Sequence, residues 1–337
     1  MNEQKLQFSV IVPTFNPDFK IFKTIDSIVN SILYFKKNTQ IEYEIIIIND
    51  GGKKIDSKIN DYDEYLNIFN LKKNKGVGYA REIGARIAKY ETIFYIDSDI
   101  IVEPKTLFTI HELYKNLKDV GSVGALQSYN NLNSNYSSKF VCAKSCYGFE
   151  DKPEPLEFSA IHSECCVINK LYLREIGGWN FYKKSGGEEF ELGHKIILSG
   201  KKNYLTKKTR YSTYYENILS RCSKIIYRTS NYLPILFSRK KFETKGAFAT
   251  TEQFLSVLLT LITVLFLAIF LCSKISLLYI LPVILLNLIF EFDFLRFSKK
   301  IYSIKEIPFF LIGIYLINFA IFIGFISGIF NLIKSNR

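Results

Sequence analysis

The stretch Thr92-Ile-Phe-Tyr-Ile-Asp-Ser-Asp99 decides the predicted fold, because a short apolar run leads directly into two carboxylates. Such a run is typical of a strand that is covered on both faces of a sheet. Comparable runs over 8–12 and 42–48 also end in polar turns. Helical patterns separate these strands, so we predict an α/β fold with a mostly parallel sheet and helices on both faces.

Further elements continue the alternation along the chain. We expect helices over about 17–35, 76–90 and 104–117, and strands over 65–69 and 121–127. The carboxyl ends of parallel strands lie at one edge of the sheet, and ligands bind beyond that edge. The residues expected to meet there are Pro13, Thr14, Phe15, Asp50, Asp97 and Asp99.

The chain carries a formal net charge of +12, and most of it comes from 201–245, where only Glu216 and Glu243 oppose twelve Lys and Arg residues. A basic block is typical of either a nucleic-acid or a membrane-surface contact. Long uncharged segments follow, and 254–272 matches the thickness of a bilayer core at about 1.5 Å per residue. We therefore predict transmembrane spans at about 254–272, 275–290 and 307–333, contact with membrane lipids, and no nucleic-acid partner.

These segments predict three regions: an α/β catalytic domain over 1–220, a basic juxtamembrane segment over 221–253, and a transmembrane region over 254–337. Basic residues before the first span and in the loop 291–306 favour a cytoplasmic catalytic domain on a multi-pass protein of the cell (inner or plasma) membrane. Ala320, Gly324 and Gly328 recur at every fourth position of the last span, a spacing that could seat a partner helix in an oligomer.

The cysteines and histidines do not predict a metal centre. Six cysteines without regular spacing are expected to be reduced thiols. Cys165 and Cys166 are adjacent on a predicted strand and point to opposite faces, so we do not expect them to share a zinc ion. The three histidines are interpreted as core or surface residues.

The two acidic clusters have both ordinary and functional explanations. Asp97 and Asp99 place two hard oxygen ligands on one short loop, which suits Mg²⁺ or Mn²⁺ holding a diphosphate. Aspartate is also common in simple turns, and the presence of Asp50 at a neighbouring strand end favours the functional explanation. Glu188 and Glu189 follow a Gly-Gly turn and, taken alone, are ordinary residues for the first turn of a helix.

In this order and spacing, the motifs resemble those of the family 2 inverting glycosyltransferases, whose catalytic domain has the GT-A fold. The likeness covers roughly residues 6–215. The matching segments are the opening strand and nucleotide loop at 8–16, the strand end at 48–52, the glycine turn and arginine at 75–81, the metal motif at 95–99, the Gly-Gly-aromatic turn at 175–179, and the motif of the catalytic base at 188–195.

The resemblance implies that a sugar moves from a nucleotide-diphosphate sugar in one metal-assisted displacement. It assigns the catalytic base to Glu189 and the binding of Mn²⁺ or Mg²⁺ to Asp97 and Asp99. The residues that it implies for binding the nucleotide sugar are Pro13, Thr14, Phe15, Asp50, Gly76, Arg81, Asp97 and Glu188.

The sequence departs from the family pattern at several positions. Glu189 and Lys195 stand where the family usually has Asp and Arg, and the stretch 209–215 lacks the histidine that many relatives use as a further metal ligand. The Gln-x-x-Arg-Trp signature of processive synthases is also absent, so long-chain polymerisation is not expected. Side chains around 125–165 are expected to select the sugar.

The function predicted first is a membrane-anchored glycosyltransferase that acts on a lipid-linked or glycan acceptor at the cytoplasmic face. If the acceptor were a polyprenyl phosphate, it would attack through its phosphate and Glu189 would not be needed as a base. An alternative is a non-catalytic membrane scaffold whose glycosyltransferase-like domain binds a nucleotide or a partner protein. A soluble nucleotidyltransferase is disfavoured by the predicted spans.

Overall fold

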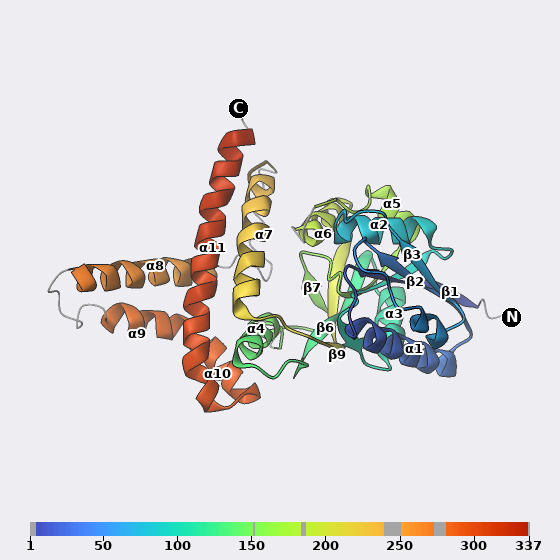
Figure 1. Cartoon of the computed structure of the whole chain (residues 1–337), viewed down its shortest axis with the longest axis horizontal. Coiled ribbons are helices and arrows are strands. Elements are labelled where there is room, and N and C mark those ends of the chain that lie inside the picture. The colour runs from blue at the N-terminus through green and yellow to red at the C-terminus, as the bar shows by residue number, and fades with distance from the viewer. Residues whose placement is uncertain (1–4, 151, 183–186, 239–250, 273–280, 336–337) are drawn as a thin grey trace. The chain divides into compact units, whose positions relative to one another are not determined.

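The structure, a computed structural model, describes residues 5–150, 152–182, 187–238, 251–272 and 281–335 (Figure 1). The chain forms two compact units. The first unit comprises Met1–Asn130 and Phe149–Tyr214, and the second comprises Asn131–Gly148 and Tyr215–Arg337. A short insertion of the α/β region therefore belongs with the C-terminal helices, which the sequence did not predict.

Four parallel strands form one half of the sheet in the first unit. They are β1 (Leu6–Thr14), β2 (Ile41–Asn49), β3 (Leu66–Asn70) and β4 (Thr92–Ile96), in the spatial order β3-β2-β1-β4. The register places Val10 opposite both Ile45 and Phe94. The apolar runs thus form the centre of the sheet, as their composition predicts.

The other half of the sheet contains antiparallel pairs. It comprises β5 (Ile100–Val102), β6 (Val120–Asn131), β7 (Leu156–Phe158), β8 (Cys165–Asn169) and β9 (Lys202–Thr213), in the order β8-β6-β9-β5 with β7 also paired to β9. Strand β8 runs antiparallel to β4, with Cys165 opposite Ile96. The first residues of β8 consequently lie beside the carboxyl end of β4.

Helices cover both faces of this mixed sheet, as predicted (Figure 1). Helices α1 (Lys20–Asn38) and α3 (Thr106–Asn116) pack on one face, around Val10 and Phe94. Helices α2 (Val77–Ile87), α5 (Lys170–Glu175) and α6 (Glu188–Leu198) pack on the other, around Ile11 and Tyr95. Adjacent residues of one strand belong to different cores because their side chains point to opposite faces of the sheet. A 3₁₀ helix, η1 (Ser57–Tyr62), precedes β3.

The second unit is helical. It comprises α4 (Tyr136–Cys146), α7 (Ile218–Ser238), α8 (Thr251–Cys272), α9 (Leu281–Phe290), α10 (Phe292–Ile301), η3 (Ile304–Glu306) and α11 (Ile307–Ser335). Among the described residues, Phe254–Cys272 and Ile304–Ile333 are long and apolar enough to cross a membrane. Helix α9 has only 10 residues, and the 275–280 part of the predicted second span lies outside the described residues.

Helix α4 is attached to the C-terminal helices by ion pairs and aromatic contacts. Lys139 Nζ lies 2.6 Å from Glu306 Oε1, and Lys144 Nζ lies 3.2 Å from Glu291 Oε2. Phe140 packs its ring edge-on against Phe294. Both glutamates are buried, so each lysine supplies the positive charge that a buried carboxylate requires. These contacts explain why α4 belongs to the second unit.

Polar side chains among the apolar helices are also paired. Asn318 Nδ2 of α11 donates to Ser256 Oγ at 2.8 Å and to Thr260 Oγ1 at 2.9 Å, both on α8. Ser256 Oγ in turn donates to Glu291 Oε1 at 2.6 Å. Interhelical hydrogen bonds of this kind hold helices together where apolar burial alone gives little preference.

The small residues Gly324 and Gly328 of α11 face another helix of the same chain. A Cβ atom added to Gly324 would lie 2.7 Å from Thr229 Cβ, and one added to Gly328 would lie 2.9 Å from Leu233 Cβ. Both contacted residues belong to α7, which packs along α11. The stripe predicted to seat a helix therefore seats α7, and it gives no support to the predicted oligomer.

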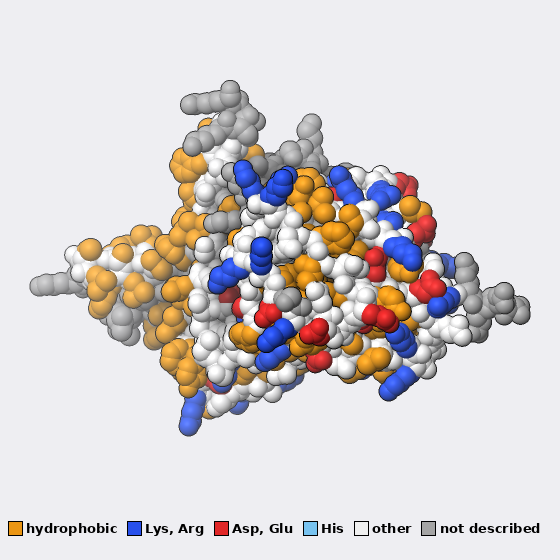
Figure 2. All heavy atoms as spheres, turned by 45° about the vertical axis from the view of Figure 1, so that its right-hand side comes forward, with side chains coloured by type: hydrophobic (Ala, Val, Ile, Leu, Met, Phe, Trp, Pro, Cys, Tyr) orange, Lys and Arg blue, Asp and Glu red, His pale blue; other side chains and the backbone are white. Residues whose placement is uncertain are grey.

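The surfaces of the two units differ in composition. Large hydrophobic side chains are exposed on α8 and α11, including Leu265, Leu271 and Phe309. Figure 2 shows hydrophobic side chains gathered over the helical unit, whereas charged side chains are scattered over the α/β unit. Exposed apolar surface of this extent is typical of contact with a membrane or a partner protein.

Candidate active site

The loops after β1 and β2 are joined to each other at the rim of the sheet. The backbone N–H of Asp50 donates to Thr14 O at 2.8 Å, and that of Lys53 donates to Asn16 Oδ1 at 3.0 Å. Gly52 has a φ of +81°, and a Cβ there would lie 2.2 Å from Asn16 Oδ1, so only glycine fits. Phe15 remains 50% exposed at this rim.

The side chain of Asp50 fixes the start of α2. Its two carboxylate oxygens accept the backbone N–H groups of Lys75 and Gly76, at 2.9 Å and 2.7 Å. Burial raises the pKa of Asp50, and the hydrogen bonds from these two backbone groups oppose that shift. Asp50 and Gly76, predicted separately to bind nucleotide, are thus in direct contact, and Asp50 holds the glycine turn in place.

Arg81 lies below the rim between two predicted site carboxylates. Its side chain is 1% exposed, with NH2 2.7 Å from Asp97 Oδ1 and NH1 3.9 Å from Glu188 Oε1. The guanidinium also lies over the ring of Trp179, with 5.1 Å between its carbon and the ring centroid. This burial favours a role for Arg81 in holding Asp97 and Glu188, and its predicted contact with the nucleotide remains a prediction.

The site carries more negative than positive charge. Burial raises the pKa of Asp97 to about 7; the neighbouring Arg81 opposes this shift, and the charges of Glu164 and Asp99 add to it. Burial disfavours the charged form of Arg81, yet Asp97, Glu189 and Glu188 together raise its pKa above the usual value. The buried guanidinium of Arg81 therefore lies between carboxylates, an arrangement that a cation would stabilise.

Glu189 enters the site from the first turn of α6. Gly187 precedes that helix with a φ of 119°, a conformation that favours glycine. The carboxylate of Glu189 accepts a hydrogen bond from Ser163 Oγ at 3.0 Å, and its backbone oxygen accepts one from Ile161 N at 3.2 Å. Both contacts join the predicted base to the segment that leads into β8.

The same segment also contacts the predicted metal motif. The backbone N–H of Asp97 donates to Glu164 O at 2.9 Å, while the adjacent Ser163 donates to Glu189. Asp97 and Glu189 are 92 positions apart by their numbers, yet they bind consecutive residues of one turn. The backbone of the predicted metal motif and the carboxylate of the predicted base are therefore bonded to the same turn.

Sequence reasoning did not single out Ser163, Glu164 or Tyr211. Tyr211 of β9 is buried, and its hydroxyl contacts both His162 Nε2, at 2.7 Å, and Glu164 Oε2, at 2.5 Å. Gln127 Nε2 donates to the same carboxylate at 2.8 Å. Ser163 and Glu164 reach the rim because β8 runs antiparallel to β4 and begins beside its carboxyl end. That pairing is long-range, so no local sequence pattern signals it.

The Gly-Gly-aromatic turn is held against α6 by Lys195. Its Nζ donates to Gly178 O and to Asn180 Oδ1, each at 2.8 Å. Gly178 has a φ of +60°, and a Cβ there would lie 2.5 Å from Glu82 Oε2. The lysine at the usual arginine position thus ties the turn to the helix that carries Glu189.

Asp97 and Asp99 offer carboxylate oxygens that suit a divalent cation whose remaining ligands come from the substrate and water. Asp99 is exposed on the rim two residues after Asp97, so both carboxylates belong to one short loop. Within the described part of the chain, no group of three or more His, Cys, Asp or Glu residues is arranged to hold a metal ion. Mg²⁺ is often bound by one or two carboxylates with phosphate oxygens and water, so two aspartates suffice.

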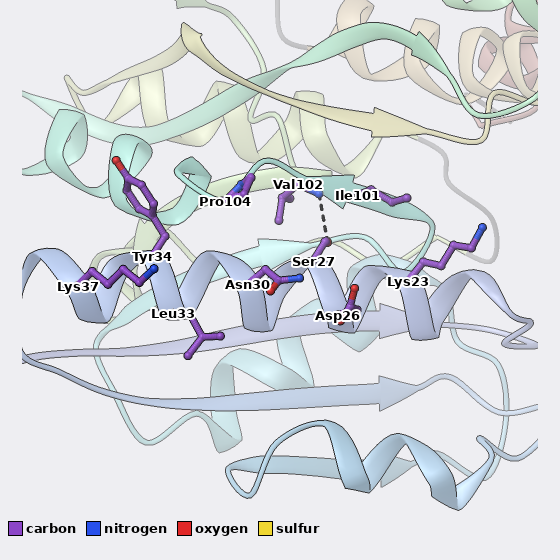
Figure 3. A pocket seen from close by; sticks show the side chains of 10 residues that line it. All are labelled: Lys23, Asp26, Ser27, Asn30, Leu33, Tyr34, Lys37, Ile101, Val102 and Pro104. Carbon is purple, nitrogen blue, oxygen red and sulfur yellow. Dashed lines mark hydrogen bonds between the residues drawn. The ribbon is translucent and has the colours of Figure 1, made fainter.

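A separate pocket lies between α1 and β5 (Figure 3). Its volume is about 530 Å³. It contains none of the predicted site residues, and the residues that line it are Lys23, Asp26, Ser27, Asn30, Leu33, Tyr34, Lys37, Ile101, Val102 and Pro104. Ser27 is already used for structure there, because its Oγ accepts the backbone N–H of Val102 at 3.2 Å.

The sequence of the chain is similar to those of known glycosyltransferases. Residues 9–177 match the family model described as Glycosyl transferase family 2. The chain is 35% identical over 112 residues to the poly(ribitol-phosphate) beta-N-acetylglucosaminyltransferase TarP of Staphylococcus aureus, covering 32% of each chain. It is 27% identical over 226 residues to the minor teichoic acid biosynthesis protein GgaB of Bacillus subtilis, covering 63% of this chain and 23% of that protein. The chain thus spans a third or less of either relative.

Among solved structures, the chain is similar to the mannosyltransferase PcManGT from Pyrobaculum calidifontis, solved with GDP-Man and Mn²⁺. The TM-score is 0.53 at 13% identity, over 99% of this chain and 89% of that one. At this identity the likeness concerns the fold alone. It confirms the predicted GT-A-like α/β arrangement followed by apolar helices.

Proposed function

Because the chain belongs to glycosyl transferase family 2, we propose that it is an inverting, metal-dependent glycosyltransferase that moves a sugar from a nucleotide-diphosphate sugar to a lipid-linked or glycan acceptor. The observation that carries this proposal is the meeting of Asp97 and Glu189 on the consecutive residues Glu164 and Ser163. A non-catalytic scaffold would not require the predicted metal motif and the predicted base to share this turn.

In the proposed complex, the donor lies across the rim of the sheet. The half-exposed ring of Phe15, beside Thr14, offers a stacking surface for the nucleoside. Asp97 and Asp99 would hold Mn²⁺ or Mg²⁺. Bound there, the cation would neutralise the diphosphate and stabilise the charge that develops on it as it leaves.

Glu189 is the proposed base. It accepts the proton of the acceptor hydroxyl while that oxygen attacks the anomeric carbon. The new bond joins the acceptor oxygen to the anomeric carbon, the bond from that carbon to the diphosphate oxygen breaks, and the nucleoside diphosphate leaves with the electron pair. A single displacement inverts the anomeric configuration. Arg81 keeps Asp97 and Glu188 in position during this step.

The relatives support the proposed substrate classes. TarP is named for transfer of N-acetylglucosamine to poly(ribitol-phosphate), and PcManGT was solved with a nucleotide sugar and Mn²⁺. A polyol or glycan acceptor reacts through a hydroxyl, which requires a base such as Glu189. We therefore favour a hydroxyl acceptor over a phosphate acceptor.

A donor screen tests this proposal. The full chain in detergent with Mn²⁺ is expected to be stabilised by one nucleotide sugar or a few, because a ligand that binds only the folded state raises the unfolding temperature. The measurement is thermal unfolding against a panel of UDP-, GDP-, CDP- and dTDP-sugars, followed by donor hydrolysis with the best of them. Absence of a shift and of hydrolysis across the whole panel, with Mn²⁺ and with Mg²⁺, would contradict the proposal.

We further propose that the helical unit anchors the enzyme in the cell membrane, with the α/β unit on the cytoplasmic side. Phe254–Cys272 and Ile304–Ile333 are long enough to span, and Arg296, Lys299 and Lys300 favour the cytoplasmic face for the segment before the last helix. Both cytoplasmic placements require the chain to cross the membrane again between α8 and α10. The described helix α9, at about 1.5 Å per residue, covers only part of that crossing, and the 275–280 part of the predicted span lies outside the described residues.

Vesicle flotation tests the anchor. The full chain reconstituted in vesicles is expected to float with the lipid and to stay bound in 1 M NaCl, because apolar burial is not screened by salt. Replacing the exposed Leu258 and Leu265 of α8 with lysine should reduce flotation, at a cost of about 2.5–3.5 kcal/mol for each charge at a helix centre. A wild-type chain that salt releases from vesicles would be bound by charge alone, contrary to this proposal.

A further inference from the structure

The turn before β8 makes contacts that the proposed chemistry has not yet used. Ser163 is 1% exposed, and its Oγ donates to Glu189 Oε1 at 3.0 Å. The backbone of the preceding Ile161 donates to the backbone oxygen of the same glutamate at 3.2 Å. The predicted base is therefore held by this one segment through both its main chain and its side chain.

The turn is held in place by hydrogen bonds with the buried Tyr211. Its hydroxyl donates to Glu164 Oε2, because an ionised carboxylate only accepts hydrogen bonds. The hydroxyl proton is then used, so the contact with His162 at 2.7 Å requires His162 Nε2 to be the donor. Burial lowers the pKa of His162, in agreement with a neutral ring. One buried tyrosine thus fixes the residues on both sides of Ser163.

Asp97 is fixed to the same turn from the other side. Its backbone N–H donates to Glu164 O at 2.9 Å, next to Ser163. The turn therefore sets the spacing between the strand end that carries Asp97 and the helix that carries Glu189. In-line displacement depends on this spacing, since errors near 1 Å in the placement of reacting groups cost roughly a hundredfold in rate.

We propose that Ser163 is a positioning residue for the base Glu189, an inference that rests on the proposed function. By donating to Oε1, the Ser163 hydroxyl fixes the rotation of the carboxylate and leaves Oε2 to accept the proton of the acceptor hydroxyl. Ser163 acts on the reaction only by orienting Glu189, and it does not contribute to the affinity for the nucleotide sugar.

Kinetics of Ser163→Ala test this proposal. The variant is expected to lower kcat about 10- to 100-fold, because the base loses its fixed orientation, while the donor KM and the donor dissociation constant stay at wild-type values. Ser163→Cys keeps the size of the side chain but has only a weak donor, and it is expected to lose most of the same rate. The control is Ser122→Ala, which removes another hydroxyl that is 1% exposed and donates to Asn203 Oδ1 at 2.6 Å.

A double-mutant cycle separates positioning from a general structural effect. In a Glu189→Ala background, Ser163→Ala should change the residual rate by less than about twofold, since two residues that act as one unit are not additive. A full additional loss in that background, or wild-type kcat in both Ser163 variants, would overturn the proposal. Lack of donor binding and turnover in the wild-type chain would instead count against the proposed function, so the two failures are distinguishable.

Discussion

Replacing Glu189 with glutamine is expected to lower kcat for sugar transfer to a hydroxyl acceptor about a thousandfold, while donor affinity stays within about twofold of the wild type. Glutamine keeps the size of the side chain and can still accept the hydrogen bond from Ser163 at the same place. It cannot take up a proton, so the acceptor oxygen would have to attack in its protonated form. The loss therefore falls on the chemical step.

The measurement is transfer of a labelled sugar, with donor affinity followed by calorimetry. A matched control is Glu157→Gln, which makes the same change at a carboxylate of the same unit that is 60% exposed and pairs with Lys202. Wild-type transfer by Glu189→Gln would remove the glutamate from the role of base. Another group would then have to take the proton of the acceptor hydroxyl. Activity found only with a phosphate acceptor, and insensitive to Glu189→Gln, would instead favour attack through the acceptor's own phosphate, which requires no base.

The centre of the fold was predictable because it depends on local composition. Strands β1, β2 and β4 are apolar runs, and each is followed by a polar turn. Parallel strands bring such ends to one rim, so the proximity of Thr14 and Asp50 followed from topology before any contact was seen. The resemblance to the family predicts Glu189 as the base, and the structure joins its carboxylate and the backbone of Asp97 to one turn.

What could not be predicted depends on long-range pairing. The sequence of β8 does not reveal that it returns antiparallel to β4, and that return is what brings Ser163 and Glu164 to the site. Likewise, Arg81 lies in an ordinary helix after a glycine turn, and only the packed structure shows it buried between two carboxylates. Local sequence patterns specify which residues form a helix or strand. Tertiary packing decides which side chains are buried and which remain exposed at the site.

In the C-terminal region, too, local composition was predictable and long-range packing was not. Its apolar helices were evident from composition, and two of them are long enough to span a bilayer. The attachment of α4 was not evident, because it depends on Lys139 and Lys144 reaching acids more than a hundred residues away. The small residues Gly324 and Gly328 were recognised as a helix seat, but which helix fills it could be learned only from the packing of α7.

Removing the carboxylate of Asp99 is expected to abolish the contribution of the cation to donor binding. In the wild type, Mn²⁺ should tighten nucleotide-sugar binding at least tenfold over the value in EDTA, equivalent to about 1.4 kcal/mol. In Asp99→Ala, the affinities with Mn²⁺ and with EDTA should coincide. The reason is that Asp97 Oδ1 already pairs with Arg81 at 2.7 Å, so without Asp99 the cation depends mainly on the diphosphate and water.

Asp99 is a sharper choice for this experiment than Asp97. Asp97 neutralises the buried Arg81 at 2.7 Å, and its removal would leave that charge without its nearest partner, so lost binding would also report lost folding. Asp99 is exposed, and its replacement leaves that pair intact. Calorimetric titration of the donor with and without Mn²⁺ gives the result, with the exposed Asp61→Ala as control. A tenfold Mn²⁺ effect that persists in Asp99→Ala would place the cation elsewhere, and the diphosphate would then have to be neutralised by groups other than this pair of aspartates.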